Sequence, residues 1–170
     1  MDLYEAIERR RSVRAYQDRP VEQDKLERIL NAARMAPSAS NRQPWKFVVV
    51  RQPELRRKLV PACREQAFIG QAPVVVAGVG TNPRRIMGCD IPSDPVDLAI
   101  AMEHIALSAV AEGLGTCWVG AFHQDQVKAL LGVPEECKVV QMMALGYPAD
   151  GDRGKDRKAL GEIVCYERFT

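Results

Sequence analysis

The sequence predicts an α+β fold, because helical and strand patterns are mixed along the chain without alternating as regular βαβ units. A helical period is clear at Leu26, Ile29, Leu30 and Ala33. In contrast, residues 73–79 form a short apolar run bounded by Pro and Gly, which is typical of a buried strand. The chain has 170 residues, a length that fits a single domain over residues 1–170 and leaves little room for a second.

Boundary residues place the other elements. Asp2 lies near the start of the first helix, Pro53 opens the third, and Gly132 ends the last. Helices are predicted at residues 2–10, from Pro20 to before Pro37, from residue 53, at 95–114 and at 124–131. Strands are predicted at residues 47–50, 73–79, 116–119 and 139–145, with a further short one at 163–166. Residues 81–93 lack periodicity and are expected to form a loop.

The longest predicted helix has a composition that suggests a dimer. Asp94 is expected to cap it, Pro95 to occupy its first position and Asp97 to place charge in its first turn. From Leu98 to Leu114 it is apolar nearly all round, and such a helix must be buried on every side. In so small a domain, a second subunit is a natural source of that cover.

The composition narrows the class of protein. The 24 basic and 22 acidic residues leave a net charge of +2, which predicts no general attraction to nucleic acid or membranes. The five cysteines are dispersed and no two form a C-x-x-C pair, which argues against a disulfide framework or a metal site. The sequence has no signal-peptide pattern and no apolar run of the roughly 18–20 residues that span a membrane, so we expect a cytoplasmic protein.

A basic cluster follows the first predicted helix, in the sequence Arg9-Arg10-Arg11-Ser12-Val13-Arg14. Four guanidiniums and a hydroxyl suit a phosphate monoester, because the planar fork of Arg matches phosphate oxygens and stays charged. The competing interpretation is a solvated helix end whose charge favours the helix dipole. Taken alone, a short basic cluster is more often only such a surface feature.

Three further segments could contact a ligand. Residues 36–45 form a turn between two prolines, rich in hydroxyls and amides, that could bind a flat heterocycle with polar edges. On composition alone, a plain helix-to-strand connection with Trp45 as a core anchor is the better explanation. In residues 113–122, Gly120 and Ala121 leave backbone amides uncovered. Gly113 and Gly115 precede a strand rather than a helix, so this segment is not a dinucleotide-binding fingerprint. Lys155 and Arg157 lie in a charged tail that solvation alone would explain.

In this order, the segments together resemble the nitroreductase family. The resemblance runs from Arg10 to the ending Tyr166-Glu167-Arg168-Phe169, and only residues 81–93 match no known pattern. It implies an α/β/α sandwich whose mainly antiparallel central sheet is flanked by helices and completed by the partner's C-terminal strand. It also implies a homodimer with two FMN sites across its interface. Such a protein uses NADH or NADPH to reduce nitroaromatics, quinones or related acceptors by a ping-pong mechanism.

The resemblance also implies roles for individual residues. The FMN phosphate would be held by Arg10, Ser12, Lys155 and Arg157, with Arg11 as a fifth contact. Arg14 would reach the pyrimidine side of the flavin, where a fixed cation raises the reduction potential. The other subunit would contribute Pro37, Ser38, Ala39, Ser40, Asn41 and Gln43. The flavin edge near N5, where the hydride arrives, would lie along Trp118 and the backbone of Val119 and Gly120.

No acid–base pair is needed for hydride transfer, so no catalytic side chain is predicted. His104 is expected to be a buried imidazole with its hydrogen bonds satisfied, within the long helix, and His123 to start the next one. If several cations close the phosphate end of the flavin site, FMN fits better than FAD, because the adenylate group of FAD could not extend out of the site. The chain is shorter than many relatives, and Met87, Cys89 and Phe122 are the candidates for the wall of the acceptor pocket.

Three other functions remain open from the sequence. A relative with the same cofactor could fragment the flavin or dehalogenate a substrate, and another could bind or store FMN without catalysis. A basic nucleic-acid module built on the arginine cluster is the third. The near-zero net charge and the lack of an aromatic stacking surface count against that last function.

Overall fold

The computed structural model describes residues 1–151 and 154–169, and a four-stranded sheet lies at its centre. The strands are β1 (Trp45–Val50), β2 (Val74–Gly80), β3 (Gly115–Val119) and β4 (Lys138–Gly146). They lie in the order β1-β2-β4-β3, and each neighbouring pair is antiparallel. The predicted antiparallel sheet is therefore confirmed, although β1 begins two residues before the predicted range.

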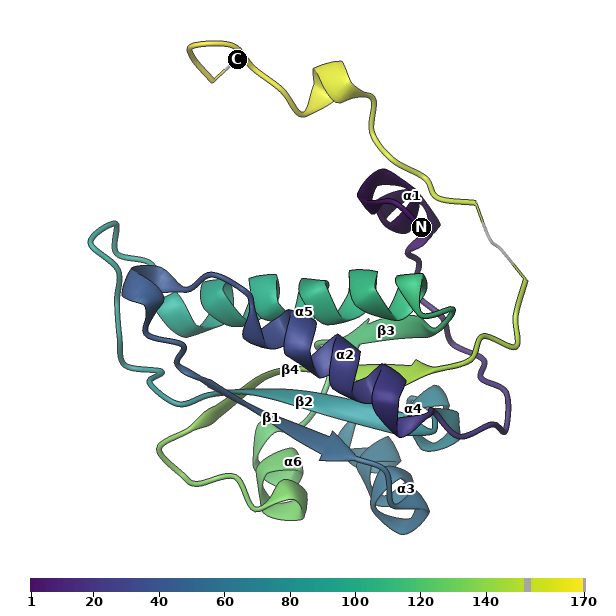
Figure 1. The fold of residues 1–170 in the computed structure, drawn as a ribbon. Helices are drawn as coiled ribbons and strands as arrows, with labels where there is room; N and C mark the ends of the chain where they lie inside the picture. Colours follow the sequence, from purple (N-terminus) through teal and green to yellow (C-terminus); the bar gives the residue numbers. More distant parts are fainter. Residues whose placement is uncertain (152–153, 170) are drawn as a thin grey trace.

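Helices cover both faces of the sheet (Figure 1). One face carries α2 (Gln23–Arg34) and α5 (Ser93–Ala111). The other carries α3 (Pro53–Ala62), α4 (Phe68–Gln71) and α6 (Gln124–Leu131). The helix α1 (Leu3–Arg9) packs outside α5. This arrangement confirms the α/β/α sandwich, and within the described residues no helix has the length and apolar character of a membrane span.

Strand β2 shows how the sequence produces two cores. Val75 and Ala77 face the core beneath α3 and α6, whereas Val74 and Val76 face α2 and α5, because successive strand residues point to opposite faces. Both faces are covered, so the strand is apolar throughout rather than alternating. At Gly78, an added Cβ would lie 3.2 Å from Leu98 Cδ2, and the glycine therefore allows α5 to approach the sheet closely.

The start of α5 differs from the prediction. The helix begins at Ser93, and its N-cap is Pro92 rather than Asp94. Asp94 lies inside the first turn, where its Oδ2 accepts a hydrogen bond from the Asn82 backbone N–H at 2.8 Å. The prediction that Asp94 caps the helix is wrong because its carboxylate serves the neighbouring loop instead.

The long helix is not covered on every side within one chain. Leu98, Met102 and Ile105 are fully buried, but Val96 and Ile100 remain exposed on the outer side. The helix ends at Ala111, before the predicted Leu114. The expected cover by a second subunit stays a prediction, because a single chain does not test it.

Two short elements and one ordered loop complete the described chain. The short helix α4 and the 3₁₀ turn η1 (Ala39–Asn41) were not predicted, because a single turn carries too little periodicity to detect. Residues 81–92 form a loop, as predicted except for the helical Ser93, and Ile86 pairs with Pro92 across it in an isolated antiparallel bridge.

The C-terminal tail forms no strand within this chain. It contains the 3₁₀ turn η2 (Leu160–Glu162) and then runs irregularly through residues 163–169. Figure 1 shows it passing α1 and continuing away from the sandwich. The strand predicted at residues 163–166 is therefore absent from the single chain, because no neighbouring strand offers it hydrogen bonds. Its pairing with a partner's sheet stays a prediction.

Candidate cofactor-binding site

The basic N-terminal segment is held beside β3 by its one buried side chain. The Val13 N–H donates to the Thr116 carbonyl at 2.9 Å, and Ser12 pairs with Thr116 as a parallel bridge. At Gly115 a Cβ would lie 2.5 Å from Val13 Cγ2, so the glycine makes room for this side chain. Because neighbouring residues of an extended segment alternate in direction, Val13 is buried while Ser12 and Arg14 are exposed.

The structure brings together the cations predicted to bind phosphate. Arg10, Arg11 and Ser12 line one hollow of about 340 Å³ with Gly154, Lys155, Asp156 and Arg157. We call this the basic hollow. A second cavity, of about 360 Å³, also contains Arg10, Lys155 and Arg157 and is closed by Glu103 and Leu107 of α5. Residues from the two ends of the chain therefore converge, as the resemblance implied.

Contacts within the chain orient these cations differently. Arg10 Nε lies 3.4 Å from Glu103 Oε1 in a partly exposed ion pair. Lys155 Nζ donates to the Ile7 carbonyl at 3.0 Å and also to that of Glu8, so it binds the C-terminal end of α1. Arg157 Nη1 donates to the Asp156 carbonyl at 2.7 Å. These contacts are at the surface and come from flexible side chains or helix-end carbonyls.

Arg11 makes a more buried ion pair than Arg10 does. Its Nη2 donates to the Asp150 Oδ1 at 2.9 Å and to the Asp150 carbonyl at 2.8 Å. Both side chains of this ion pair are only 14% exposed, and the pair ties the N-terminal segment to the chain after β4. Arg11 lines the basic hollow, but its guanidinium is directed at Asp150.

The thiol of Cys117, on β3, lies close enough to the basic segment for its pKa to respond to the arginines there. Burial raises the pKa of the Cys117 thiol, while Arg14, a hydrogen bond with Ser12 and Arg10 act in the opposite direction. Both arginines thus contribute positive charge near β3, which would favour an anion bound beside them.

The predicted polar turn, residues 37–43, has an unusual backbone. Ser40, Asn41 and Gln43 all have positive φ, at 56°, 52° and 53°, a region that residues other than glycine seldom adopt. Ser38 Oγ accepts from the Gln43 N–H at 2.9 Å, which closes the turn. The side chains of Pro37, Ser40, Asn41 and Gln43 are exposed.

This turn does not line the basic hollow of its own chain. It is attached near the start of α5, where Asp97, the fifth residue of the helix rather than part of its first turn as predicted, accepts through Oδ1 from the Ala39 N–H at 2.9 Å. Arg10 reaches the same helix six residues later, at Glu103. That separation corresponds to about 9 Å along the axis and to a different side of the helix.

The end of β3 presents an open backbone. Trp118 is half-buried and Val119 is buried, whereas Gly120 is exposed. A Cβ at Gly120 would meet no atom within 4 Å. The chain's own packing therefore does not require glycine at this position, and the backbone is accessible to a ligand.

The structure separates the candidates for the acceptor pocket. Met87 and Cys89 lie in the loop between β2 and α5, whereas Phe122 packs against the core on the α3 and α6 side of the sheet. His104 Nδ1 lies 3.0 Å from the Ala32 carbonyl, which confirms the predicted hydrogen bond, but the imidazole is half-buried rather than buried. His123 is the N-cap residue of α6, as predicted.

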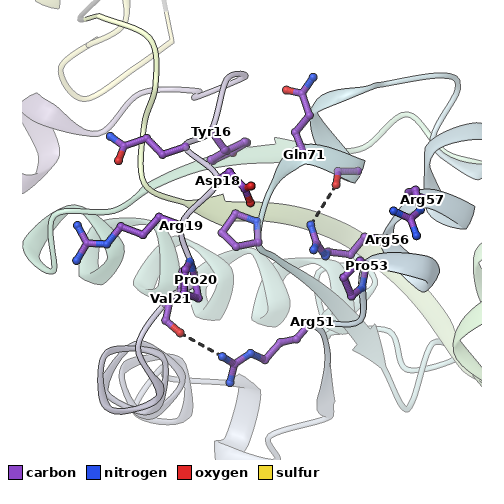
Figure 2. Close-up of a pocket in the computed structure, with 13 residues that line it drawn as sticks. Tyr16, Asp18, Arg19, Pro20, Val21, Arg51, Pro53, Arg56, Arg57 and Gln71 are labelled. Carbon is purple, nitrogen blue, oxygen red and sulfur yellow. Dashed lines mark hydrogen bonds between the residues drawn. The ribbon is translucent and has the colours of Figure 1, made fainter.

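A larger cavity lies elsewhere in the chain and also contains arginines. This cavity, of about 570 Å³, lies between the segment before α2, the end of β1 and the start of α3, and Figure 2 shows the residues that line it. We call it the linker hollow. Its four arginines are Arg19, Arg51, Arg56 and Arg57. None of them belongs to a segment singled out from the sequence.

Each of these arginines is engaged by its own surroundings. Arg56 Nη1 donates to the Gly70 carbonyl at 3.0 Å and to the Ala72 carbonyl. Arg51 donates to the Val21 carbonyl at 3.2 Å (Figure 2). The remaining two pair with glutamates: Arg19 with Glu22 and Arg57 with Glu54. The contacts of Arg51 and Arg56 join neighbouring elements, whereas the two glutamate pairs are local, three residues apart in sequence. The linker hollow is thus a structural junction held by Arg51 and Arg56.

Three acidic residues make contacts that were not predicted from the sequence. Glu103 contacts Arg10, Asp150 holds Arg11, and Asp97 holds the turn at residues 37–43. Glu103 carried a signal, since it is a charged residue inside an otherwise apolar helix. The other two carried none, because a carboxylate's partner far away in the sequence is visible only in the fold.

The strand order, the helices on both faces and the cationic hollow beside β3 define a nitroreductase-type α/β/α sandwich. Comparison with known proteins agrees. The model of the nitroreductase family matches residues 7–85 and 64–147, and the chain belongs to this family.

Individual relatives match over most of their length. A protein of Methanothermobacter thermautotrophicus named NADH dehydrogenase/NAD(P)H nitroreductase is 34% identical over 166 residues, covering 92% of this chain and 82% of its own. The crystal structure of a nitroreductase family protein from Clostridium difficile 630 superposes with a TM-score of 0.89 at 32% identity, covering 99% and 100% of the two chains. An FMN reductase [NAD(P)H] of Bacillus subtilis is 27% identical, covering 92% of this chain and 70% of its own.

Proposed function

We propose that this chain is an FMN-dependent oxidoreductase that takes electrons from NADH or NADPH and reduces nitroaromatics, quinones or related acceptors by a ping-pong mechanism. The observation that carries the proposal is the basic hollow, in which Arg10, Ser12, Lys155 and Arg157 converge from the two ends of the chain. Relatives named as FMN or NAD(P)H oxidoreductases support the same function.

The chemistry of the hollow fits the phosphate of FMN. Guanidiniums, an ammonium and a hydroxyl supply the charge-assisted donors that a phosphate dianion accepts. Glu103 is the unfavourable element, since it is a carboxylate 3.4 Å from Arg10. The nearest approach in that contact is by Nε of Arg10 at 3.4 Å, and the guanidinium would turn its terminal nitrogens to the phosphate when FMN binds. Arg11 would contribute mainly through its charge, since it is directed at Asp150.

When bound, the flavin would supply the redox chemistry by accepting a hydride and passing electrons to the acceptor. The chain's own residues would bind and orient it. Arg14, exposed beside the hollow, would lie at the pyrimidine side of the ring and stabilise negative charge there. The open backbone of Val119 and Gly120 would lie along the ring edge and leave N5 accessible.

We propose further that two subunits share each site. Within one chain the turn at residues 37–43 does not line the basic hollow, so it would lie over the flavin of the partner. Exposed apolar side chains on α1, α5 and the tail support a dimer, among them Tyr4, Ile100 and Leu160. An obligate interface of this kind buries on the order of 2,000–5,000 Å².

One spectroscopic experiment tests the cofactor and the reaction together. The purified protein should show flavin absorbance, and anaerobic addition of NADH or NADPH should bleach it. A colourless protein that takes up no FMN would contradict the flavin assignment. Bound FMN that no nicotinamide reduces would instead favour a storage protein or other flavin chemistry. Relatives named 5,6-dimethylbenzimidazole synthase and iodotyrosine deiodinase 1 make that second outcome a real alternative.

A truncation tests the shared site. Removing the chain after Lys158 deletes the exposed apolar tail that would cross to the partner. We expect an aggregating or flavin-free product, measured by size-exclusion chromatography with light scattering and flavin absorbance. A stable monomer that retains FMN would exclude a site shared between subunits.

A further inference from the structure

Two buried carboxylates lie at the start of α5. The Asp94 and Asp97 residues are only 1% and 3% exposed, and the adjacent Ser93 is fully buried. Within the described residues, neither carboxylate pairs with an arginine or lysine. Burial of a carboxylate without a cation is costly, and burial accordingly raises the pKa of Asp94. An apolar residue would suit this core better, so the carboxylates must serve another purpose.

Each carboxylate holds the backbone of a different connection. Asp97 Oδ1 accepts from the Ala39 N–H at 2.9 Å, and Asp94 Oδ2 accepts from the Asn82 N–H at 2.8 Å. The second oxygen of each, Asp97 Oδ2 and Asp94 Oδ1, is buried with no hydrogen-bond partner in the described part of the chain. Each carboxylate thus uses one oxygen to accept a hydrogen bond from one backbone N–H.

The strand opposite the helix is shaped to accommodate this arrangement. At Gly80, which ends β2, an added Cβ would lie 2.5 Å from Asp94 Oδ2. Any other residue at this position would displace the carboxylate. The start of α5 and the end of β2 are therefore both built around buried carboxylates.

The turn that Asp97 holds needs such a constraint. Ser40, Asn41 and Gln43 all adopt positive φ, and a strained backbone persists only where its surroundings over-determine it. The hydrogen bond from the Ala39 N–H to Asp97 ties this turn to the rigid helix α5. The exposed side chains of this turn are those that the proposed function places on the partner's flavin.

We propose that Asp97 is a positioning residue for the flavin site of the other subunit, acting through the turn at residues 37–43. This inference rests on the proposed function. Asp97 does not touch the cofactor; its carboxylate fixes the Ala39 N–H, and through it the shape of the surface that Pro37, Ser38 and Ser40 present. Asp94 performs the same task for the loop at residues 81–93.

Substitutions at Asp97 separate positioning from simple stability. Asp97→Leu removes the acceptor and should weaken FMN binding about tenfold and alter the visible circular dichroism of the bound flavin. Asp97→Asn keeps an acceptor oxygen and should restore both. Gln124→Leu is the matched control, because it loses two hydrogen bonds to Val139 on the opposite face of the sheet. It should lower stability and leave FMN binding unchanged. If the leucine variant does not fold, Asp97→Ala makes the same comparison.

A mixed dimer tests whether the turn acts across the interface. When an Arg10→Ala subunit is paired with an Asp97→Leu subunit through two affinity tags, one site collects both defects and the other collects none. The mixed dimer should therefore bind one FMN per dimer with wild-type affinity. If the turn served its own chain, both sites would be weakened and no wild-type site would appear.

The outcomes separate this proposal from the proposed function. A wild-type protein that binds no FMN would overturn both. Two results would overturn the positioning role alone, given a wild type that binds FMN. In one, Asp97→Leu binds FMN as tightly as the wild type does. In the other, Asp97→Leu and Gln124→Leu lose the same amount of FMN affinity.

Discussion

Two groups of arginines surround two hollows, and they differ in what holds their guanidinium groups. In the linker hollow, Arg56 and Arg51 donate to backbone carbonyls at the ends of neighbouring elements. In the basic hollow, Arg10 makes a long ion pair with Glu103, and Arg157 donates to the carbonyl of the adjacent Asp156. The first two arginines supply donors to part-buried carbonyls, whereas the second two can exchange their more exposed contacts for a ligand.

The comparison shows that cavity size and arginine number are poor guides to a binding site. The linker hollow is the larger, at about 570 Å³ against about 340 Å³. Two of its arginines, Arg51 and Arg56, donate to part-buried carbonyls, and a buried carbonyl left without a donor is costly. In the basic hollow only Arg11 has such a part-buried acceptor among the described residues, in Asp150, whereas Arg10 and Arg157 make more exposed contacts. Substitutions in the two hollows should therefore separate stability from cofactor binding.

The largest expected effect is on FMN affinity in the basic hollow. Arg10→Ala or Arg157→Ala removes a charge-assisted phosphate contact worth about 1.5–3 kcal/mol, so FMN affinity should fall roughly ten- to a hundredfold. Equilibrium dialysis or fluorescence titration measures this. Riboflavin, which lacks the phosphate, should bind poorly to the unchanged protein, and similar affinities for the two flavins would contradict the phosphate assignment.

The linker hollow should show the opposite pattern. Arg56→Leu leaves the carbonyls of Gly70 and Ala72 without their donor, at a cost of about 1–3 kcal/mol in the free energy of unfolding. FMN affinity should stay at the wild-type value. Urea denaturation of the apoprotein and an FMN titration make the two measurements. A large loss of FMN affinity without a loss of stability would remove the distinction between the two hollows.

Glu103 offers a substitution of opposite sign within the basic hollow. Glu103→Gln removes the carboxylate that lies 3.4 Å from Arg10 Nε and its repulsion of the phosphate, while keeping a polar side chain of similar size. FMN affinity should rise about two- to fivefold, since partly exposed charge pairs are worth up to about 1 kcal/mol. The gain should shrink at high salt. A weaker affinity in the variant would mean that the charge of Glu103 is needed to orient Arg10.

Arg14 should affect the flavin's potential more than its binding. Arg14→Ala removes the cation expected beside the pyrimidine ring, so the midpoint potential of bound FMN should fall while the phosphate contacts persist. Spectroelectrochemistry on both forms gives the comparison. An unchanged potential would show that this side chain points away from the ring.

The smallest effect is a pH dependence at the edge of the linker hollow. The hydroxyl of Tyr147, with lesser help from Arg19, lowers the pKa of Glu22 to about 2. A lowered pKa in the folded state stabilises the protein above the ordinary value of 4.5 and loses that contribution as the pH falls toward about 2. Glu22→Gln should therefore be slightly less stable than the wild type near neutral pH, and the two unfolding curves should converge in acid.

The elements that the sequence predicted well are those with long patterns. The apolar run of β2 and the helical period at Leu26, Ile29 and Ala33 result from burial of one face of each element. Such patterns can be recognised from neighbouring residues in the sequence alone. The cap of α5 was mispredicted because Asp94 is a good N-cap residue by type, while its actual partner, Asn82, is chosen by the fold. The short helix α4 lacked the length to show a period.

By itself, the sequence determined the α+β class, the family resemblance and the cations that would meet a phosphate, because those depend on residue type and order. Only the tertiary structure decided which arginines gather around the basic hollow and which join elements in the linker hollow. It also decided that Asp97 holds the turn at residues 37–43. The reason is physical: a side chain's charge is written in the sequence, but its partner is fixed by the packing of segments far apart along the chain.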